Sequence, residues 1–267
     1  MTRDDKKGQV VEDAADIYEA FFVPALFQAW PEKLVATTTI TTGANVLDVA
    51  CGTGVLARYL ATQVGKPDLV TGVDINAGML AVAKRQAPNI HWQQAAAEQL
   101  PFESNRFDTV FCQFGLMFFN DRITAISEMY RVLRSGGQLV VAVWDALENT
   151  LGYLAVCQLL QNLFGKDVAK EMRAPYALGN IEALSTLFTS ANIGKFSIAT
   201  SSAMARFRSV DDWMYTDIKG WTLADVLSDS QFERLLDHAD SALKGFTNDD
   251  GSVSFATPAH IVSVTKT

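Results

Sequence analysis

Short apolar runs alternate with amphipathic segments through the first half of the chain. The runs read as strands at 46–49, 69–73, 106–113 and 138–144, with a shorter and more polar one at 89–94. Apolar residues recur at helical spacing between them, at 55–64, 77–87 and 121–133. Strands that alternate with helices indicate an α/β fold built on a parallel sheet. The polar run predicts a strand at the edge of that sheet.

Helical patterns precede and follow this alternating half. Residues 1–8 predict a frayed tail, and two helical pieces are expected at 10–22 and 25–36, separated by Pro24. In the second half the pattern predicts helices at 151–164, 167–173, 180–191, 210–218 and 224–243, and strands at 195–200 and 252–265, the last broken by Pro258. About fifty residues separate these two strands, which is more than a hairpin loop needs.

The long separation predicts an insertion in a single domain that spans residues 1–267. We expect 208–245 to form a helical lid that meets a second lid element, 9–42, across the mouth of the active site. Arg134-Ser135-Gly136-Gly137 is expected to end the preceding helix with a glycine cap.

The composition excludes several classes of protein. Of 267 residues, 49% are hydrophobic and 19% are charged, which is ample for a core. The net charge of −8 argues against a nucleic-acid partner, because sequence-independent binding needs a basic surface. No apolar run is long enough to cross a membrane, and the start resembles no secretory signal. The three cysteines lack metal-ligand spacing, so we expect reduced thiols, no metal site and a cytoplasmic protein.

The segment 45–57 carries the strongest chemical signal. It reads Asn-Val-Leu-Asp-Val-Ala-Cys-Gly-Thr-Gly-Val-Leu-Ala, which is a buried strand, a glycine turn and the start of a helix. Such a unit holds a nucleotide-sized ligand at the carboxyl edge of a parallel sheet. Gly52 and Gly54 let the backbone pass close to the ligand. Asp48 is a carboxylate in a buried strand, which is rare unless an acceptor is needed there.

This segment resembles the first motif of the class I S-adenosylmethionine-dependent methyltransferases. The resemblance implies a Rossmann-like fold, a doubly wound and mostly parallel seven-stranded sheet with an antiparallel last strand. It also implies that Asp48 and the turn formed by Ala50, Cys51, Gly52 and Gly54 hold the amino-acid end of S-adenosylmethionine. The residues alone leave a competitor open, because 52–57 also fits the G-x-G-x-x-A fingerprint of dinucleotide-binding proteins.

Further matches extend the resemblance to residue 144. Asp74 ends the second strand, where a carboxylate accepts the ribose hydroxyls, and Asn76 can cap the next helix. Ile75 and Met79 are then expected to flank the adenine, with backbone contact from Ala97. Relatives commonly carry an Asp where this chain has Ala96, so the adenine amino group needs another acceptor here. The remaining predicted cofactor contacts lie at the end of the fourth strand, at Gln113 and Phe114.

The acceptor is expected beside that strand end. The run 114–119 is rich in large apolar side chains, which suggests the wall of an apolar pocket. Aromatic residues of the N-terminal helices could close over it. The predicted substrate-pocket residues are Tyr18, Phe22, Trp30, Met117 and Trp144.

These residues point to methyl transfer to a small, partly apolar molecule by in-line displacement. A sulfonium donor already activates its methyl group, so alignment and exclusion of water can suffice and no catalytic residue is assigned. We expect structural or surface roles for His91, His238 and His260. Two alternatives stay open: a non-catalytic protein that binds S-adenosylmethionine or its product S-adenosylhomocysteine, and an NAD-dependent dehydrogenase. The Y-x-x-x-K match of Tyr215 and Lys219 lies outside the context that a dehydrogenase requires.

Overall fold

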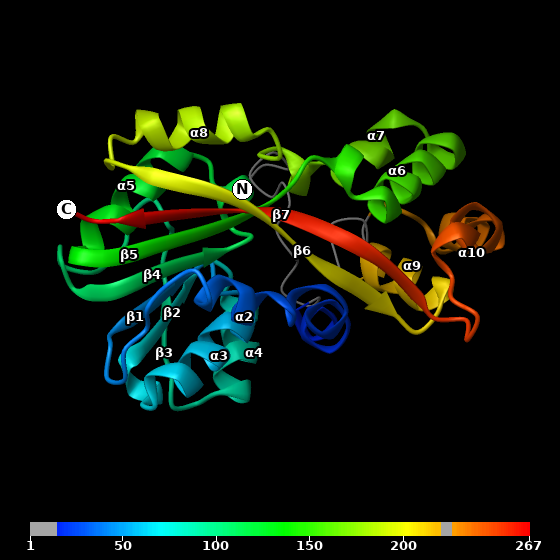
Figure 1. Ribbon diagram of the computed structural model, residues 1–267. Helices are drawn as coiled ribbons and strands as arrows, with labels where there is room; N and C mark the ends of the chain where they lie inside the picture. The colour runs from blue at the N-terminus through cyan, green and yellow to red at the C-terminus, as the bar shows by residue number, and fades with distance from the viewer. Residues whose placement is uncertain (1–14, 220–225) are drawn as a thin grey trace.

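A seven-stranded sheet forms the centre of the computed structural model, which describes residues 15–219 and 226–267 (Figure 1). The strand order is β3-β2-β1-β4-β5-β7-β6. The strands are β1 Val46–Val49, β2 Val70–Asp74, β3 His91–Gln94, β4 Phe107–Gln113, β5 Leu133–Trp144, β6 Phe196–Phe207 and β7 Val253–Thr265. Strands β1 to β5 pair in parallel, and β7 runs antiparallel to β5 and β6. The predicted doubly wound sheet, its antiparallel last strand and the edge position of β3 are confirmed.

Helices cover both sides of this sheet. In Figure 1, α5 and α8 lie on one side, and α2, α3 and α4 lie on the other. The helices are α1 Ala15–Ile17, α2 Trp30–Val35, α3 Val55–Val64, α4 Ala77–Gln86, α5 Arg122–Val132, α6 Leu151–Phe164, α7 Lys166–Glu171, α8 Ile181–Ser190, α9 Val210–Lys219 and α10 Asp229–Leu243. Single 3₁₀ turns occur at η4 Pro67–Leu69, η5 Leu116–Phe118, η6 Leu147–Asn149, η7 Ala174–Tyr176 and η8 Lys244–Phe246. None of the described helices is long and apolar enough to span a bilayer.

Strand β6 is longer than the predicted 195–200, β7 matches the predicted 252–265 closely, and the two strands project beyond the rest of the sheet. Pairing of β5 with β7 ends at Trp144 and Ala259, whereas β6 and β7 stay paired as far as Phe207 and Val253. Pro258 lies one residue past the end of the β5 pairing. A missing N–H is tolerated there because β5 no longer flanks the strand, so the predicted break at Pro258 was wrong.

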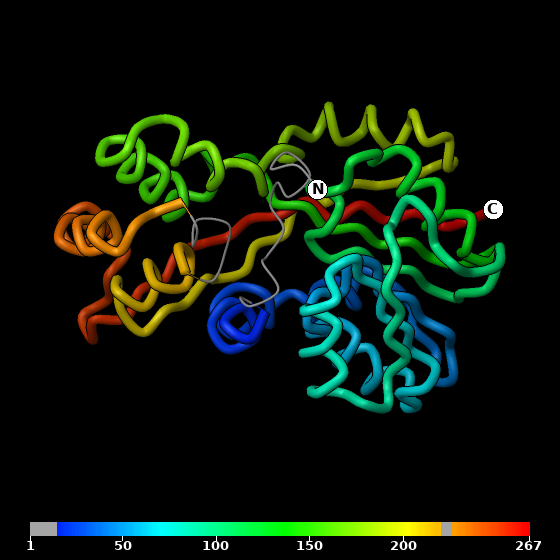
Figure 2. Tube along the Cα trace, turned by 180° about the vertical axis from the view of Figure 1, so that it is seen from behind, coloured from blue at the N-terminus to red at the C-terminus, as the bar shows by residue number. Residues whose placement is uncertain are grey.

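Four helices gather around the projecting ribbon: α6, α7, α9 and α10 (Figures 1 and 2). Their shared core is aromatic. The ring of Trp213 lies 4.7 Å from that of Phe255 and 5.6 Å from that of Phe207, measured between centroids. The outer part of the ribbon therefore carries a hydrophobic cluster at a distance from the carboxyl ends of β1, β2 and β4.

Two predicted helix ends were wrong. Pro24 does not interrupt the N-terminal helix but lies inside η3, a π-helix at Tyr18–Phe27, whose wider turns are shown by the Gln28 N–H donating to the Val23 carbonyl. Helix α5 ends at Val132 without a glycine cap, because Leu133 is already extended and pairs with Phe107. Gly136 has a positive φ of 75° and donates its N–H to the carbonyl of Lys266. The predicted residues 10–14 lie outside the described part of the chain.

Gly152 of α6 gives a test of the packing around the ribbon. A Cβ at this position would lie 2.5 to 2.7 Å from ring atoms of Phe255. We expect Gly152→Ala to lower the free energy of unfolding by about 1–3 kcal/mol, the usual cost of overpacking, as measured by denaturant titration. Gly245→Ala is the matched control, because a Cβ there meets nothing within 4 Å. Equal stability of the two variants would contradict this packing.

Candidate functional site

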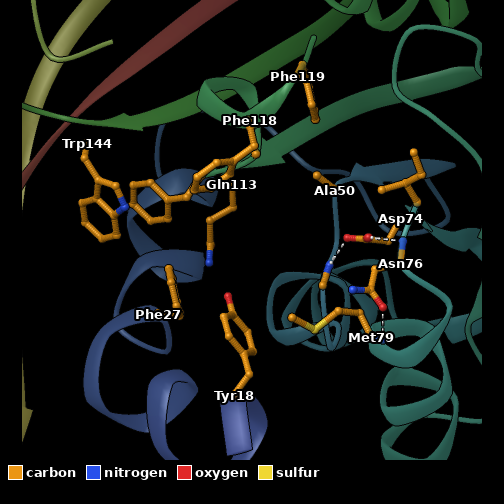
Figure 3. A pocket seen from close by; sticks show the side chains of 14 residues that line it. Tyr18, Phe27, Ala50, Asp74, Asn76, Met79, Gln113, Phe118, Phe119 and Trp144 are labelled. Carbon is orange, nitrogen blue, oxygen red and sulfur yellow. Dashed lines mark hydrogen bonds between the residues drawn. The ribbon is translucent and has the colours of Figure 1, made fainter. Parts of the chain in front are cut away.

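A cavity of about 810 Å³, open mouth included, lies at the carboxyl ends of β1, β2 and β4 (Figure 3). Its floor comes from the turns after these strands and its far wall from the N-terminal helix and the end of β5. The lining residues are Tyr18, Phe27, Ala50, Gly52, Asp74, Ile75, Asn76, Met79, Gln113, Phe114, Gly115, Phe118, Phe119 and Trp144.

Asp74 forms hydrogen bonds with both turns that make up the floor of the cavity. Its Oδ2 accepts the N–H of Gly52 at 2.8 Å, and its Oδ1 accepts the N–H of Asn76 at 2.8 Å (Figure 3). Burial raises the pKa of Asp74, and these two N–H groups oppose the rise. A carboxylate oxygen can accept more than one hydrogen bond, so each still has capacity for a ligand donor. The structure places Asp74 where the sequence predicted an acceptor.

The two glycines of the first turn have different roles. Gly52 lines the cavity and has a φ of +55°. Gly54 begins α3 with a φ of +88°, and a Cβ there would lie 2.5 Å from the ring of Trp92. Gly54 therefore packs under Trp92 and is not among the lining residues, and its contact with the cofactor stays a prediction. Cys51 is also buried outside the lining.

Asp48 lies beneath the cavity floor. It is fully buried, neither carboxylate oxygen has a hydrogen-bond partner among the described residues, and it does not line the cavity. Burial raises the pKa of Asp48 well above its usual range, while the N–H of Ala57 in the first turn of α3 opposes the rise. The predicted hold of Asp48 on the amino-acid end of the donor stays a prediction.

A second hollow of about 400 Å³, open mouth included, adjoins the main cavity. Ala50, Asp74 and Ile75 line both, and Ala96 and Ala97 line the second. Ile75 and Met79 both line the main cavity, and Ile75 also lines the second hollow. Asp74 thus lies at the junction of two spaces.

The wall opposite Asp74 is aromatic. Trp144 stacks on Phe114 with centroids 3.7 Å apart and an interplanar angle of 6°, and Tyr18 and Phe27 complete the wall (Figure 3). Three predicted pocket residues lie behind this wall instead, at 0–3% exposure: Phe22, Trp30 and Met117. Trp30 packs edge-on against both Phe114 and Trp144, so it supports the wall without lining it.

Sequence reasoning did not assign Phe27 and Asn76 to the cavity, and it included Gly115, Phe118 and Phe119 only as part of the expected wall at 114–119. Phe27 has the helical spacing of core residues. Asn76 was predicted only as the cap of α4, which its side chain forms, but it also lines the cavity. Gly115 allows close approach, because a Cβ there would lie 2.5 Å from Cβ of Ala50.

The strand ends that flank the cavity are strained. Ala50 after β1 and Phe114 after β4 both have a φ of 56°, in the left-handed region that side chains disfavour. Each costs of order 1–2 kcal/mol. Non-glycine residues held in this way cluster at functional sites.

The predicted lid 208–245 does not reach the cavity with any described residue. It packs against the N-terminal segment, where Phe21 and Tyr215 form an edge-on pair with centroids 5.5 Å apart. From the predicted N-terminal element, Tyr18 and Phe27 line the cavity directly.

No histidine lines the cavity. His91 lies on the edge strand β3, and His238 faces the carbonyl of Arg234 within α10. His260 is buried, with its Nε2 3.0 Å from the Gly179 carbonyl and 3.0 Å from Oδ1 of Asp145. That network fixes the turn after Trp144. The described residues hold no cluster of His, Cys, Asp or Glu that could bind a metal.

Comparisons with known proteins agree with this geometry. A family described as "Methyltransferase domain" matches residues 46–137. The "Ubiquinone/menaquinone biosynthesis C-methyltransferase UbiE" of Stenotrophomonas maltophilia is 39% identical over 49% of this chain and 55% of its own length. The chain thus spans about half the length of that relative. The Neisseria meningitidis UbiE protein is 34% identical over 64% of this chain and 75% of its own.

Solved structures share the fold. The Bacillus protein YcgJ superposes with a TM-score of 0.60 at 19% identity, over 90% of this chain and 99% of its own. Phosphoethanolamine N-methyltransferase 2 of Haemonchus contortus, solved with S-adenosylhomocysteine, superposes with a TM-score of 0.63 at 20% identity. The match covers 99% of this chain and 60% of that protein. At these identities the likeness concerns the fold alone.

The fully buried carboxyl of Asp48 predicts an unusual response of stability to pH. When folding raises the pKa of an acid, the acid loses its proton more readily in the unfolded chain. The protein therefore loses stability as the pH rises from the pKa of the acid in the unfolded chain, about 4, toward its pKa in the folded protein. We expect Asp48→Asn to increase the free energy of unfolding at pH 7–8 by about 1–3 kcal/mol, and the gain to shrink as the pH falls toward 4.

Denaturant titration across this pH range measures the effect. Asp108→Asn is the matched control, because Asp108 is partnered: its Oδ2 accepts the Asn45 N–H at 2.6 Å and its Oδ1 pairs with Arg134. That variant should lose stability. A loss in Asp48→Asn at neutral pH would show that the carboxylate is stabilised in a way that the structure does not contain.

Proposed function

The chain belongs to the class I S-adenosylmethionine-dependent methyltransferases, and on that premise we propose that it transfers a methyl group from S-adenosylmethionine to a small, partly apolar acceptor. The observation that carries the proposal is the position of Asp74 at the junction of two hollows. A carboxylate there is placed to accept the ribose hydroxyls of a nucleoside that extends into both spaces.

The residues of the two hollows fit this donor. Gly52 leaves room where a side chain would fill the floor, and its N–H fixes the Asp74 carboxylate. Oε1 of Gln113 is buried and has no hydrogen-bond partner among the described residues. It can therefore accept a hydrogen bond from the ammonium group of the donor. Aromatic faces at Tyr18, Phe27 and Phe114 favour a positive sulfur. The hollow beside Ala96 and Ala97 is available to the adenine.

The mechanism that follows is alignment in a space shielded from water. When bound, S-adenosylmethionine supplies an activated methyl group on a sulfonium. Asp74 and Gln113 fix the orientation of the donor, and Trp144 stacked on Phe114 gives the acceptor a flat apolar surface. Burial raises the pKa of Tyr18, which keeps its hydroxyl protonated as a hydrogen-bond donor. No side chain is assigned as a general base.

The organisation of the chain is part of the proposal. The whole chain acts as one methyltransferase domain, in which the segment around Tyr18 and Phe27 covers the cavity. The region 208–245 supports this cover from behind through Tyr215. Three buried, unpaired cysteines support a cytoplasmic location.

Binding and turnover test the proposal separately. Calorimetric titration with S-adenosylmethionine, S-adenosylhomocysteine and NAD should show binding of the first two and none of NAD. Transfer of labelled methyl to a panel of phenols, quinones and amines should then yield a labelled product. Binding without any turnover would favour a non-catalytic role, and binding of NAD in place of the other two would overturn the proposal.

A substitution at Asp74 tests the site. Asp74→Asn keeps the shape but replaces one carboxylate oxygen by a donor, so a ribose hydroxyl loses a charge-assisted partner. We expect the affinity for S-adenosylhomocysteine to fall about fivefold to 150-fold, which corresponds to 1–3 kcal/mol. Asp68→Asn, at an exposed acid of η4, is the control and should bind as the wild type does. Unchanged affinity in Asp74→Asn would remove the ribose assignment.

A further inference from the structure

The second hollow, beside Ala96 and Ala97, is also lined by two residues with polar side chains, Glu98 and Asn120. We propose that the carboxylate of Glu98 accepts a hydrogen bond from the amino group of the adenine, and that it thereby selects an adenosyl donor against one with another purine base. The inference rests on the methyl donor proposed above, and it names the residue that recognises the base of that donor.

The part of the hollow that lies away from the main cavity is the place for the amino group. Asp74 lines both spaces and takes the ribose at their junction. The ring edge that carries the amino group is the part of adenine farthest from the sugar. Glu98 and Asn120 line the second hollow and not the main cavity. Their side chains therefore lie at the end of the hollow that this edge reaches.

The three alanines at 95–97 offer the base no side-chain acceptor. The carbonyl of Ala96 already accepts the N–H of Gln99, at 3.2 Å. The N–H of Ala97 donates to no other residue in the described part of the chain, so it is available to N1 of the adenine ring. N1 is adjacent to the amino group. A base bound in this way has its amino group beside Ala97, where the next side chain along the chain is that of Glu98.

The Glu98 carboxylate has one oxygen that is held and one that is available. Its Oε1 accepts the N–H of Asn120 at 3.0 Å and that of Asp121 at 3.3 Å, just before α5. These bonds hold the carboxylate between the two segments that line this end of the hollow. Its Oε2 has no hydrogen-bond or ion-pair partner among the residues that the structure describes. A ligand therefore meets an acceptor that is already oriented and loses little freedom on binding.

A carboxylate distinguishes purine bases by the group that they carry at C6. An ionised carboxylate only accepts hydrogen bonds, so it attracts the amino group of adenine and repels the carbonyl oxygen of hypoxanthine or guanine. A hydrogen bond to a charged acceptor is also stronger than one between neutral groups. Glu98 is placed to determine the base that this site accepts.

Asn120 is the competing acceptor. Its side-chain oxygen also has no partner among the described residues, but its side chain is exposed. An amide carries a donor as well as an acceptor and can turn to present either one. Asn120 would therefore accept a base with an amino group and a base with a carbonyl group alike. Only Glu98 gives the hollow a fixed preference for a donor on the base.

The probe is the analogue of S-adenosylhomocysteine whose base is unsubstituted purine, which lacks the amino group and keeps N1. Calorimetric titration gives the ratio of its dissociation constant to that of S-adenosylhomocysteine. We expect the wild type to prefer S-adenosylhomocysteine about threefold to thirtyfold, on the scale of one charge-assisted hydrogen bond at a half-exposed site. A wild-type ratio of one would overturn the proposal without any variant.

Glu98→Gln separates recognition of the base from support of the loop. The oxygen of the new amide can still accept the N–H groups of Asn120 and Asp121, but a donor replaces the oxygen that faces the base. We expect the ratio to fall to about one. If Glu98 only held the loop, the variant would weaken both ligands by the same factor. An unchanged ratio would therefore overturn the proposal.

Two further variants serve as controls. Glu103→Gln, at an exposed acid of the same loop, and Asn120→Ala should both keep the wild-type ratio. A ratio that falls in Asn120→Ala and not in Glu98→Gln would assign the amino group to Asn120 and overturn the proposal. Melting curves verify that each variant folds.

The two proposals fail in different ways. Binding of S-adenosylhomocysteine with a ratio unaffected by Glu98→Gln would leave the methyl donor in place and overturn the role of Glu98. Absence of S-adenosylhomocysteine binding to the wild-type protein would instead overturn the methyl donor, and the inference about its base with it.

Discussion

The carboxylate of Asp74 is the constraint on which the site depends. One of its oxygens accepts the N–H of Gly52 in the turn after β1, and the other accepts that of Asn76 at the start of α4. Two separate strand ends are thereby held at a fixed spacing. The floor of the main cavity and the entrance to the adjoining hollow both follow from this spacing. A bound nucleoside then meets an acceptor that is already oriented, with little left to reorganise.

Local pattern predicted the nucleotide-binding half of the fold well. Strand β1, helix α3 and the cap Asn76 lie where the sequence placed them. Each is specified by neighbours in the chain: an apolar run, a glycine turn or a capping side chain. The length of β6 was not predictable in this way, because its extra pairs with β7 depend on the aromatic cluster that forms around the ribbon.

The site was predicted less completely, for a geometric reason. Asp48 and Asp74 look alike in sequence, but Asp48 lies within β1, beneath the first turn of α3, whereas Asp74 is the last residue of β2 and faces the cavity. Trp30 and Trp144 are both buried aromatics, and only their packing shows that one supports the wall while the other forms it. The sequence identifies which residues gather at the strand ends. Which of them face the cavity depends on tertiary packing, which the sequence pattern does not contain.

The central claim is that the junction at Asp74 holds the adenosyl part of the donor, and a crystal structure with S-adenosylhomocysteine tests it most directly. The account predicts ribose hydroxyls within hydrogen-bond distance of the Asp74 carboxylate and the adenine in the hollow beside Ala97. Ligand density at another edge of the sheet, or a ribose that does not touch Asp74, would contradict it.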